Sequence, residues 1–217
     1  MAHLRPAILL TGFGAFPGVD SNATAALIPD LAEAARTRFP QHEVISAILP
    51  TEWSGAPLAL KRLLTDTNVV LALHFGVAPE ARGFQIELVG RNVCDARHDA
   101  VGALPTCEAV IATGPAMLAS TLPAERIVAR LLRGGFPCST STNAGTYLCN
   151  ALMYHSLTSA RARSTPFLSG FIHVPTGLSN KMCPAGEDAS TCELTWASAI
   201  AGSIEIIAAS LETAPVL

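Results

Sequence analysis

The sequence has little charge, few aromatic residues and no long hydrophobic run. Charged residues make up 14% and aromatic residues 6% of the 217 residues, whereas hydrophobic residues make up 50%. Such a composition excludes a disordered chain and indicates a large packed core. No stretch approaches the about 18 apolar residues that a membrane span needs, so we expect no membrane partner and a cytoplasmic location.

Clusters that would bind nucleic acid, metals or nucleotides are also missing. The net charge is −3, and the Lys and Arg residues are scattered, so we expect no nucleic-acid partner. The third glycine of "TGFGAFPG" is displaced from the G-x-G-x-x-G pattern of a dinucleotide site. The six cysteines form no C-x-x-C pair and lie outside zinc-finger spacing of any histidine, so we expect no metal and no cofactor.

Apolar runs alternate with helical patterns along the chain, which is typical of an α/β protein with a mainly parallel sheet wrapped by helices. We expect one domain over residues 1–217. The pattern predicts strands over 7–14, 43–49, 68–77, 84–93, 136–142 and 167–175, and helices over 22–39, 54–66, 122–135, 145–157 and within 188–212. The strand at 84–93 follows its predecessor after a short turn, so it is antiparallel or at an edge and the sheet is mixed. Residues 94–118 have no strong period and are expected to form an irregular loop or flap.

The segment "STNAGTYLCNALMYHS" (141–156) contains the first candidate for chemistry. A helix starting near Gly145 or Thr146 puts Cys149 in its first turn, where unsatisfied N–H groups favour a thiolate and can bind an oxyanion. The other interpretation is a small apolar residue packed under the helix. His155 lies on a different helical face, so it is an unsuitable partner and is expected to be a surface or half-buried histidine.

Two further residues could complete a catalytic group with Cys149. His173 stands near the end of the apolar strand "SGFIHVP", and strand ends at the carboxyl edge of an α/β sheet converge with helix N-termini. The alternative for His173 is a core histidine satisfied by the backbone. Glu87 is isolated in the apolar "FQIELVG" and needs a partner if it is buried, so we expect it to orient His173, with a surface position as the competing view.

Five ordered segments together resemble the pyroglutamyl peptidase I (pyrrolidone-carboxylate peptidase) family of cysteine peptidases. They are "LLTGFGAFPG", "HFGVAPEARGFQIELVGRNVCDAR", "GPAMLASTLPAERIV", "STNAGTYLCNALMY" and "SGFIHVP". The resemblance implies a three-layer α/β/α sandwich, a homo-oligomer (dimer or tetramer) and hydrolysis of the amide bond after an N-terminal pyroglutamyl residue of peptides. By matched position it implies Cys149 as nucleophile, His173 as base and Glu87 as the group that orients it. It also implies Arg97 for transition-state stabilisation and three substrate-binding residues, Phe13, Phe16 and Asn22.

Some positions depart from the family pattern and leave two alternatives. Leu88 follows Glu87 where arginine is usual, and "HVPTGLSNKM" (173–182) replaces a tyrosine- and proline-containing ending. A cysteine amidase of the same fold, acting on another small acyl group, is favoured if these changes reshape the pocket. A catalytically silent binding protein is the third hypothesis, although it would not need Cys149, His173 and Glu87 together.

Overall fold

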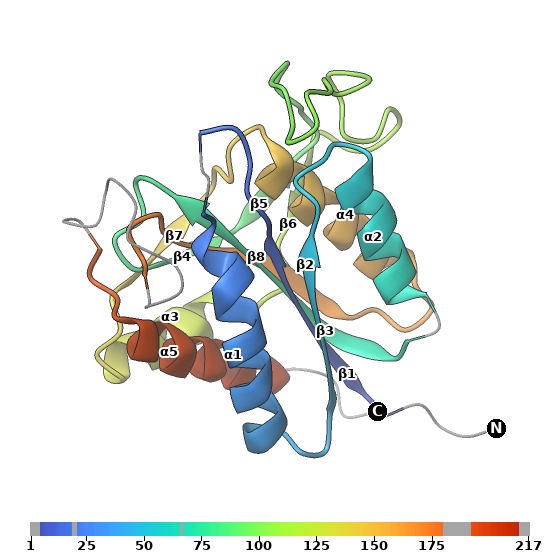
Figure 1. Cartoon of the computed structure of the whole chain (residues 1–217). Coiled ribbons are helices and arrows are strands. Elements are labelled where there is room, and N and C mark those ends of the chain that lie inside the picture. The colour runs from blue at the N-terminus through green and yellow to red at the C-terminus, as the bar shows by residue number, and fades with distance from the viewer. Residues whose placement is uncertain (1–4, 19–20, 66, 180–191, 213–217) are drawn as a thin grey trace.

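The computed structural model describes residues 5–18, 21–65, 67–179 and 192–212. Within them, a six-stranded sheet lies between two layers of helices (Figure 1). The strands are β1 (Ala7–Phe13), β2 (Glu43–Leu49), β3 (Val69–Ala78), β4 (Phe84–Glu87), β5 (Val89–Arg91), β6 (Met117–Ala119), β7 (Cys138–Ser141) and β8 (Leu168–Pro175). The helices are α1 (Ala23–Arg38), α2 (Gly55–Leu64), α3 (Ala124–Arg133), α4 (Leu148–Ala162) and α5 (Trp196–Leu211).

The order of strands in the sheet is β2-β1-β3-β8-β4-β7. All neighbouring pairs are parallel except β4 with β8, which are antiparallel. The prediction of a mixed, mainly parallel sheet is therefore confirmed. The expected strand at 84–93 is divided: β4 enters the sheet between β8 and β7, so the edge alternative is wrong, and β5 pairs with β6 in a separate two-stranded sheet.

The two faces of the sheet are covered by different helices, which gives the three layers that the resemblance implies (Figure 1). The alternation of β1 shows how: Ile8 and Leu10 belong to the core cluster that includes residues of α1, α3 and α5. Leu9 and Phe13 belong to the cluster that includes residues of α2 and α4. Because successive strand residues point to opposite faces, one apolar run serves both cores.

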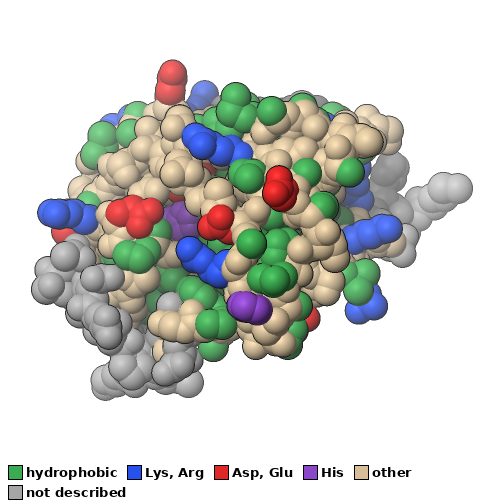
Figure 2. Space-filling model, turned by 90° about the horizontal axis from the view of Figure 1, so that it is seen from above, with side chains coloured by type: hydrophobic (Ala, Val, Ile, Leu, Met, Phe, Trp, Pro, Cys, Tyr) green, Lys and Arg blue, Asp and Glu red, His purple; other side chains and the backbone are tan. Residues whose placement is uncertain are grey.

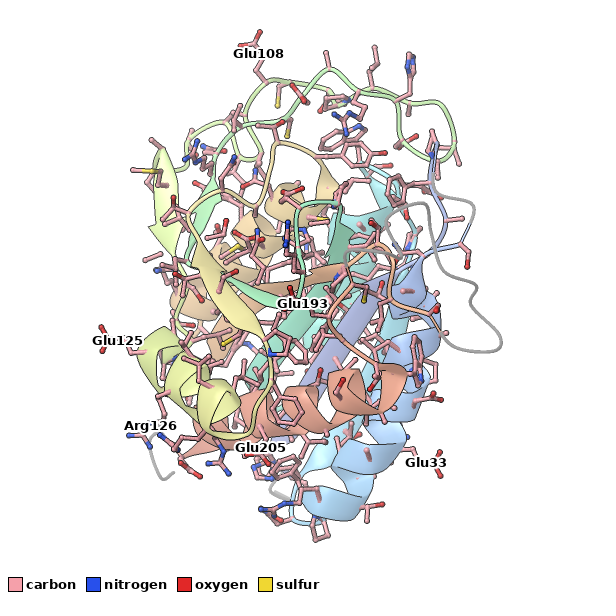
Figure 3. The ribbon with its side chains drawn as sticks, turned by 90° about the vertical axis from the view of Figure 1, so that its left-hand side faces the viewer. Glu33, Glu108, Glu125, Arg126, Glu193 and Glu205 are labelled. Carbon is pink, nitrogen blue, oxygen red and sulfur yellow. The ribbon has the colours of Figure 1, made fainter. Side chains whose placement is uncertain are left out.

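The helices begin and are held in ways that local chemistry explains. Asn22 caps α1 by accepting a hydrogen bond from Thr24 N, and Pro29 lies in the second turn of that helix. Thr195 caps α5 through a reciprocal pair of bonds with Ser198. On the outer surface, Arg126 lies on α3 and Glu205 lies on the adjacent helix α5 (Figure 3). Each of them forms an ion pair with another residue, and these pairs connect α3 to α5 and its C-terminal end.

Residues 92–116, here called the flap, connect β5 to β6 through turns and bends. An irregular loop was expected over nearly this range, and only its last two residues belong to β6. The carboxylate of Asp99 holds the flap against the start of α2: it accepts hydrogen bonds from the N–H groups of Trp53 (3.0 Å), Val101 (3.0 Å) and Ala103 (2.8 Å). In the part of the chain that the structure describes, none of the helices has the length and apolarity to cross a membrane.

Candidate active site

The pairing of β4 with β8 brings a carboxylate and an imidazole to one face of the sheet. In this antiparallel pair Gln85 lies opposite His173, and Glu87 lies opposite Phe171. Residues two apart on a strand point to the same side, so Glu87 is a diagonal neighbour of His173 and their side chains can meet. β4 and β8 run in opposite directions, so their carboxyl ends lie at opposite ends of the paired region. Glu87 reaches His173 because it is the last residue of β4 and lies two register positions from His173, opposite Phe171.

Glu87 and His173 form a buried pair. His173 Nδ1 lies 2.8 Å from Glu87 Oε1, and Gln85 Nε2 donates a hydrogen bond of 2.9 Å to the same oxygen. The Glu87 side chain is fully buried, and 6% of the His173 side chain is exposed. An unpaired carboxylate would be costly here, so the contact with His173 accounts for an acid in this apolar strand. The surface alternative for Glu87 is wrong, and His173 has a carboxylate partner rather than the backbone alone.

Cys149 is the second residue of α4 and is partly exposed. The helix begins at Leu148, so the expected start near Gly145 or Thr146 is early by two or three residues. The reason is the backbone of Gly145, whose φ of +77° is left-handed and cannot lie inside a right-handed helix. The expected place of Cys149 in the first turn is nevertheless correct. The N–H groups of that turn have no acceptor within the helix, and the Tyr147 side chain does not cap them.

The sulfur of Cys149 packs over Gly76 of β3. A Cβ atom at Gly76 would lie 3.0 Å from Cys149 Sγ and 2.8 Å from a ring carbon of Phe171. Gly76 is opposite His173 in the parallel pair of β3 and β8. The missing side chain therefore leaves room for the sulfur beside the imidazole, and the His173 side chain hydrogen-bonds with Cys149 as well as with Glu87.

These contacts favour the charged form of the imidazole. Burial alone would lower the pKa of His173, but hydrogen bonds with Cys149 and Glu87 and the charges of both raise it to about 10. Burial would raise the pKa of Glu87, yet hydrogen bonds with His173 and Ser141 and the charge of His173 lower it. An imidazolium paired with the Glu87 carboxylate is therefore favoured at neutral pH, and a cysteine nucleophile is commonly activated by an imidazole held in this way.

A small cavity opens beside Cys149. Its volume is about 20 Å³, and it is lined by Phe13, Phe16, Asn22 and Tyr147 as well as Cys149. Phe13 is buried, while Phe16 is partly exposed, with its ring centroid 6.2 Å from that of Tyr147. The structure thus brings the three expected substrate-binding residues to the same cavity as the sulfur.

The amide of Asn22 makes its hydrogen bonds within the protein. Asn22 Oδ1 accepts from Thr24 N at 3.1 Å and from Thr24 Oγ1 at 2.8 Å. Asn22 Nδ2 donates to the carbonyl oxygen of Gly14 at 3.2 Å. These bonds fix the start of α1 to the loop after β1, so Asn22 shapes the wall of the cavity.

Arg97 lies on the flap and contacts the cavity through Tyr147. The guanidinium carbon of Arg97 is 5.3 Å from the ring centroid of Tyr147, within the range of a cation–π interaction. The carbonyl oxygen of Arg97 accepts a hydrogen bond of 2.9 Å from Trp53 Nε1, and the Trp53 ring packs edge-on against Tyr147 at 5.2 Å. The expected transition-state residue is therefore held at the rim, above a ring that lines the cavity.

Known proteins share this fold and much of this sequence. Residues 6–210 match the family described as pyroglutamyl peptidase. The chain belongs to this family. A pyrrolidone-carboxylate peptidase of Pyrococcus furiosus is 34% identical over 169 residues, which cover 77% of this chain and 80% of that protein. One of Vibrio vulnificus is 36% identical over 172 residues, or 77% of each chain.

The solved structures agree with the pyroglutamyl peptidase assignment. A mutant pyrrolidone carboxyl peptidase from Pyrococcus furiosus superposes with a TM-score of 0.82 at 29% identity, covering 95% of this chain and 98% of that chain. The crystal structure of Pf-PCP(1-204)-C gives a TM-score of 0.81 at 28% identity, covering 95% of this chain and 96% of that chain. The family resemblance and the α/β fold class predicted from the sequence are thereby confirmed.

Three residues at the site are not among those predicted from the sequence: Gly76, Gln85 and Tyr147. Gly76 interrupts an apolar strand, which could have indicated a close approach of another group. Gln85 lies two residues before Glu87 and so on the same face of the strand. Tyr147 precedes Cys149 by two residues, but no pattern predicts that its ring meets Phe16.

Metal ligands are not assigned at this site. Across the described ranges, no group of three or more His, Cys, Asp or Glu side chains could hold a metal ion. The side chains that converge at the cavity are instead a thiol, an imidazole, a carboxylate and several aromatic rings.

Asn150, the neighbour of Cys149, ties the first turn of α4 to the start of the flap. Its side chain is fully buried, and Nδ2 donates to the carbonyl oxygens of Arg91 (2.9 Å) and Val93 (3.0 Å). Its Oδ1 accepts from the N–H of Arg91 at 2.8 Å. The Asn150 amide thus makes the hydrogen bonds that a neighbouring strand would otherwise make with this backbone. It also fixes the segment that leads to Arg97.

Replacing Asn150 by alanine is expected to lower the free energy of unfolding by about 3 kcal/mol, since each of three buried hydrogen bonds contributes about 1 kcal/mol. Urea unfolding followed by circular dichroism measures the change. Asn143→Ala is the matched control, because Asn143 is exposed and its replacement should alter stability by less than about 0.5 kcal/mol. Equal losses in the two variants would contradict a clamping role for Asn150.

Proposed function

We propose that this protein is a cysteine exopeptidase that hydrolyses the amide bond after an N-terminal pyroglutamyl residue. The observation that carries the proposal is the buried Glu87–His173 pair, 2.8 Å apart, beside Cys149 at a helix N-terminus, in a chain that belongs to the pyroglutamyl peptidase family. In this proposal Cys149 is the nucleophile, His173 is the general acid and base, and Glu87 orients the imidazole.

The mechanism has two halves. The Cys149 thiolate attacks the carbonyl carbon that links pyroglutamate to the next residue, and N–H groups of the first turn of α4 bind the oxyanion. His173 then gives its proton to the leaving amine, and a thioester of pyroglutamate remains on Cys149. Water, losing a proton to His173, hydrolyses the thioester and restores the ion pair. Arg97 contributes positive charge at the rim during both halves.

The cavity fits the chemistry of a lactam. Pyroglutamate is a flat, neutral five-membered ring, and its faces can pack between the aromatic side chains of Phe13, Phe16 and Tyr147. An ordinary N-terminus carries an ammonium group, whose desolvation among these rings would be uncompensated. Selection for a neutral N-terminal ring follows from this difference.

The cavity is too small to admit a lactam ring without a rearrangement. A volume of about 20 Å³ holds one water-sized group. A lactam ring therefore enters only when partly exposed side chains move apart, and Phe16 and Tyr147 are the rings in a position to do so. Substrate binding then includes a local rearrangement of these two rings.

The wild-type protein is expected to release a fluorescent amine from a pyroglutamyl amide and to turn over the prolyl and free glutamyl amides more slowly by a factor on the order of 10⁴. Initial rates for the three amides under reducing conditions measure this selectivity. Faster turnover of another amide would replace the proposal by an amidase of the same fold. No turnover of any of the three would favour the binding protein.

One catalytic domain over residues 1–217, assembly into a homo-oligomer and a cytoplasmic location are part of the same proposal. The five described cysteines are free thiols, which fits a reducing compartment. Exposed apolar side chains, Val101 and Leu104 on the flap and Met117 on β6, support assembly. Figure 2, which looks down on the face that carries the flap, shows apolar side chains spread among separate charged ones.

A further inference from the structure

A second, larger cavity lies between the flap, the two residues before α2, and α4. Its volume is about 220 Å³. The side chains that matter here are Trp53 and Ser54 before α2, Ala151 and His155 of α4, and Cys94 and Cys107 of the flap. Cys149 does not line it, because that side chain faces the sheet on another side of α4. The proposed peptidase mechanism uses none of the thiol and imidazole groups of this cavity.

The backbone holds the two flap cysteines close together. The N–H of Cys94 donates a hydrogen bond of 2.6 Å to the carbonyl oxygen of Glu108, the residue after Cys107. In Figure 3 the Glu108 side chain lies at the outer edge of the flap and points away from the body of the protein. Both cysteine side chains reach the same cavity on the inner side.

The backbone before Cys94 and the backbone after Cys107 are both fixed by asparagine side chains that lie outside residues 94–107. Asn150 binds the backbone at 91–93, immediately before Cys94. Asn92 binds the backbone just after Cys107: its Nδ2 donates to the carbonyl oxygens of Ile111 (2.8 Å) and Gly114 (3.0 Å), and its Oδ1 accepts from Ile111 N at 2.8 Å. The proximity of the two cysteines is therefore built into the fold.

The two thiols differ in accessibility. Cys107 is exposed, whereas Cys94 is partly buried, and both are free. Burial and the nearby Cys107 raise the pKa of Cys94 to about 11. Burial lowers the pKa of His155, so the imidazole in this cavity is neutral near pH 7. Cys107 is the thiol that an oxidant meets first, and Cys94 is placed to react second.

We propose that Cys94 and Cys107 are a reversible modification site that forms a disulfide across the flap when a low-molecular-weight disulfide, such as oxidised glutathione, is present. The Cys107 thiolate attacks one sulfur of that molecule, forms a mixed disulfide and expels a thiolate. Cys94 loses its proton to solvent and attacks Cys107 Sγ, and the second small thiolate leaves and is protonated. Two protein thiols are thus oxidised while one small disulfide is reduced to two thiols.

The closed ring would contain the part of the flap that touches the candidate active site. Residues 94–107 include Arg97, which contacts the Tyr147 ring, and His98, whose carbonyl oxygen accepts a hydrogen bond of 3.0 Å from Tyr147 Oη. They also include the buried Asp99. A disulfide between the ends of this segment would restrict its conformations without involving Cys149.

Trypsin offers a direct test, because it separates the two cysteines into peptides 92–97 and 98–126, each with one cysteine. The intact protein is incubated with oxidised and reduced glutathione at several ratios, its remaining thiols are blocked with N-ethylmaleimide, and it is digested without reduction. Mass spectrometry should find the two peptides joined by a disulfide, with the loss of two free thiols. The readout does not depend on peptidase activity, so it stands or fails apart from the proposed function.

Two variants and an unfolded sample make the result decisive. Cys107→Ser should leave peptide 92–97 as the maleimide adduct, while the matched control Cys138→Ser should still give the joined peptides. Joined peptides should appear in native protein at a lower ratio of oxidised to reduced glutathione than in protein unfolded by urea. The proposal is overturned if both cysteines end as glutathione or maleimide adducts, if Cys107 joins another cysteine, or if the unfolded chain forms the link as readily.

Discussion

Replacing Cys149 by alanine should abolish release of amine from a pyroglutamyl amide, with a loss in kcat of at least about 10⁴-fold. The reason is that Cys149 is the only thiol among the described residues that line the cavity, and its sulfur lies over Gly76 at the start of α4, beside His173. Any residual rate acceleration in the variant would come from binding of the substrate and from the N–H groups at the start of α4. Steady-state rates for purified wild type and variant, measured under a reducing agent, give the ratio.

The matched control is Cys138→Ala. Cys138 is also partly buried and begins the strand that leads into the same turn, yet it does not line the cavity beside Cys149. It should keep activity close to that of the wild type. Retention of activity in Cys149→Ala, or an equal loss in both variants, would exclude Cys149 as the nucleophile.

Replacing His173 by glutamine should lower kcat by about 10²–10⁴-fold, the usual contribution of a general acid and base. Glutamine keeps a hydrogen-bonding side chain of similar size but cannot transfer a proton to the leaving amine. His155→Gln is the control, because that half-buried histidine faces the other cavity and should leave the rate nearly unchanged. A similar rate for His173→Gln and the wild type would remove His173 from the mechanism.

The same variant should change how stability depends on pH. The folded-state pKa of His173, about 10, lies above the ordinary value of 6.5, so the stabilising contribution is complete below pH 6.5 and is lost as the pH rises towards 10. Relative to His173→Gln, the wild type should lose up to about 1.4 kcal/mol of unfolding free energy for each pH unit in that window. Denaturation curves from pH 6 to 10 measure the unfolding free energy of both proteins. The same pH dependence of that free energy in the two proteins would contradict a favoured imidazolium.

Strand positions follow from the sequence because most of the buried strands are short apolar runs with clear ends. β2 has the expected bounds at 43–49, β1 ends one residue earlier than expected, and β3 begins and ends one residue later. The division of 84–93 could not be predicted, since Leu88 continues the apolar pattern. The break depends on tertiary contacts of its backbone: the N–H of Leu88 donates to the Ser141 carbonyl, and its own carbonyl accepts from Ser120 N.

The candidate site shows a similar limit. Cys149, His173 and Glu87 stand out locally, as a cysteine in a first helical turn, a histidine near a strand end and an acid in an apolar strand. How they meet is decided by the antiparallel sense of β4 and by its register on β8, which no local pattern contains. The same holds for Asn150, whose buried amide can be understood only after β5 is placed beside α4.

The seam between β4 and β8 also sets when the site can form during folding. Glu87 and His173 are separated by 86 residues, and their contact requires the three paired positions of that seam. Such long-range pairing carries a large loop-closure cost and is slow compared with the formation of a helix. A chain that has folded α4 but not this seam carries Cys149 without its base, so the thiol gains its partner only when distant parts of the sheet have joined.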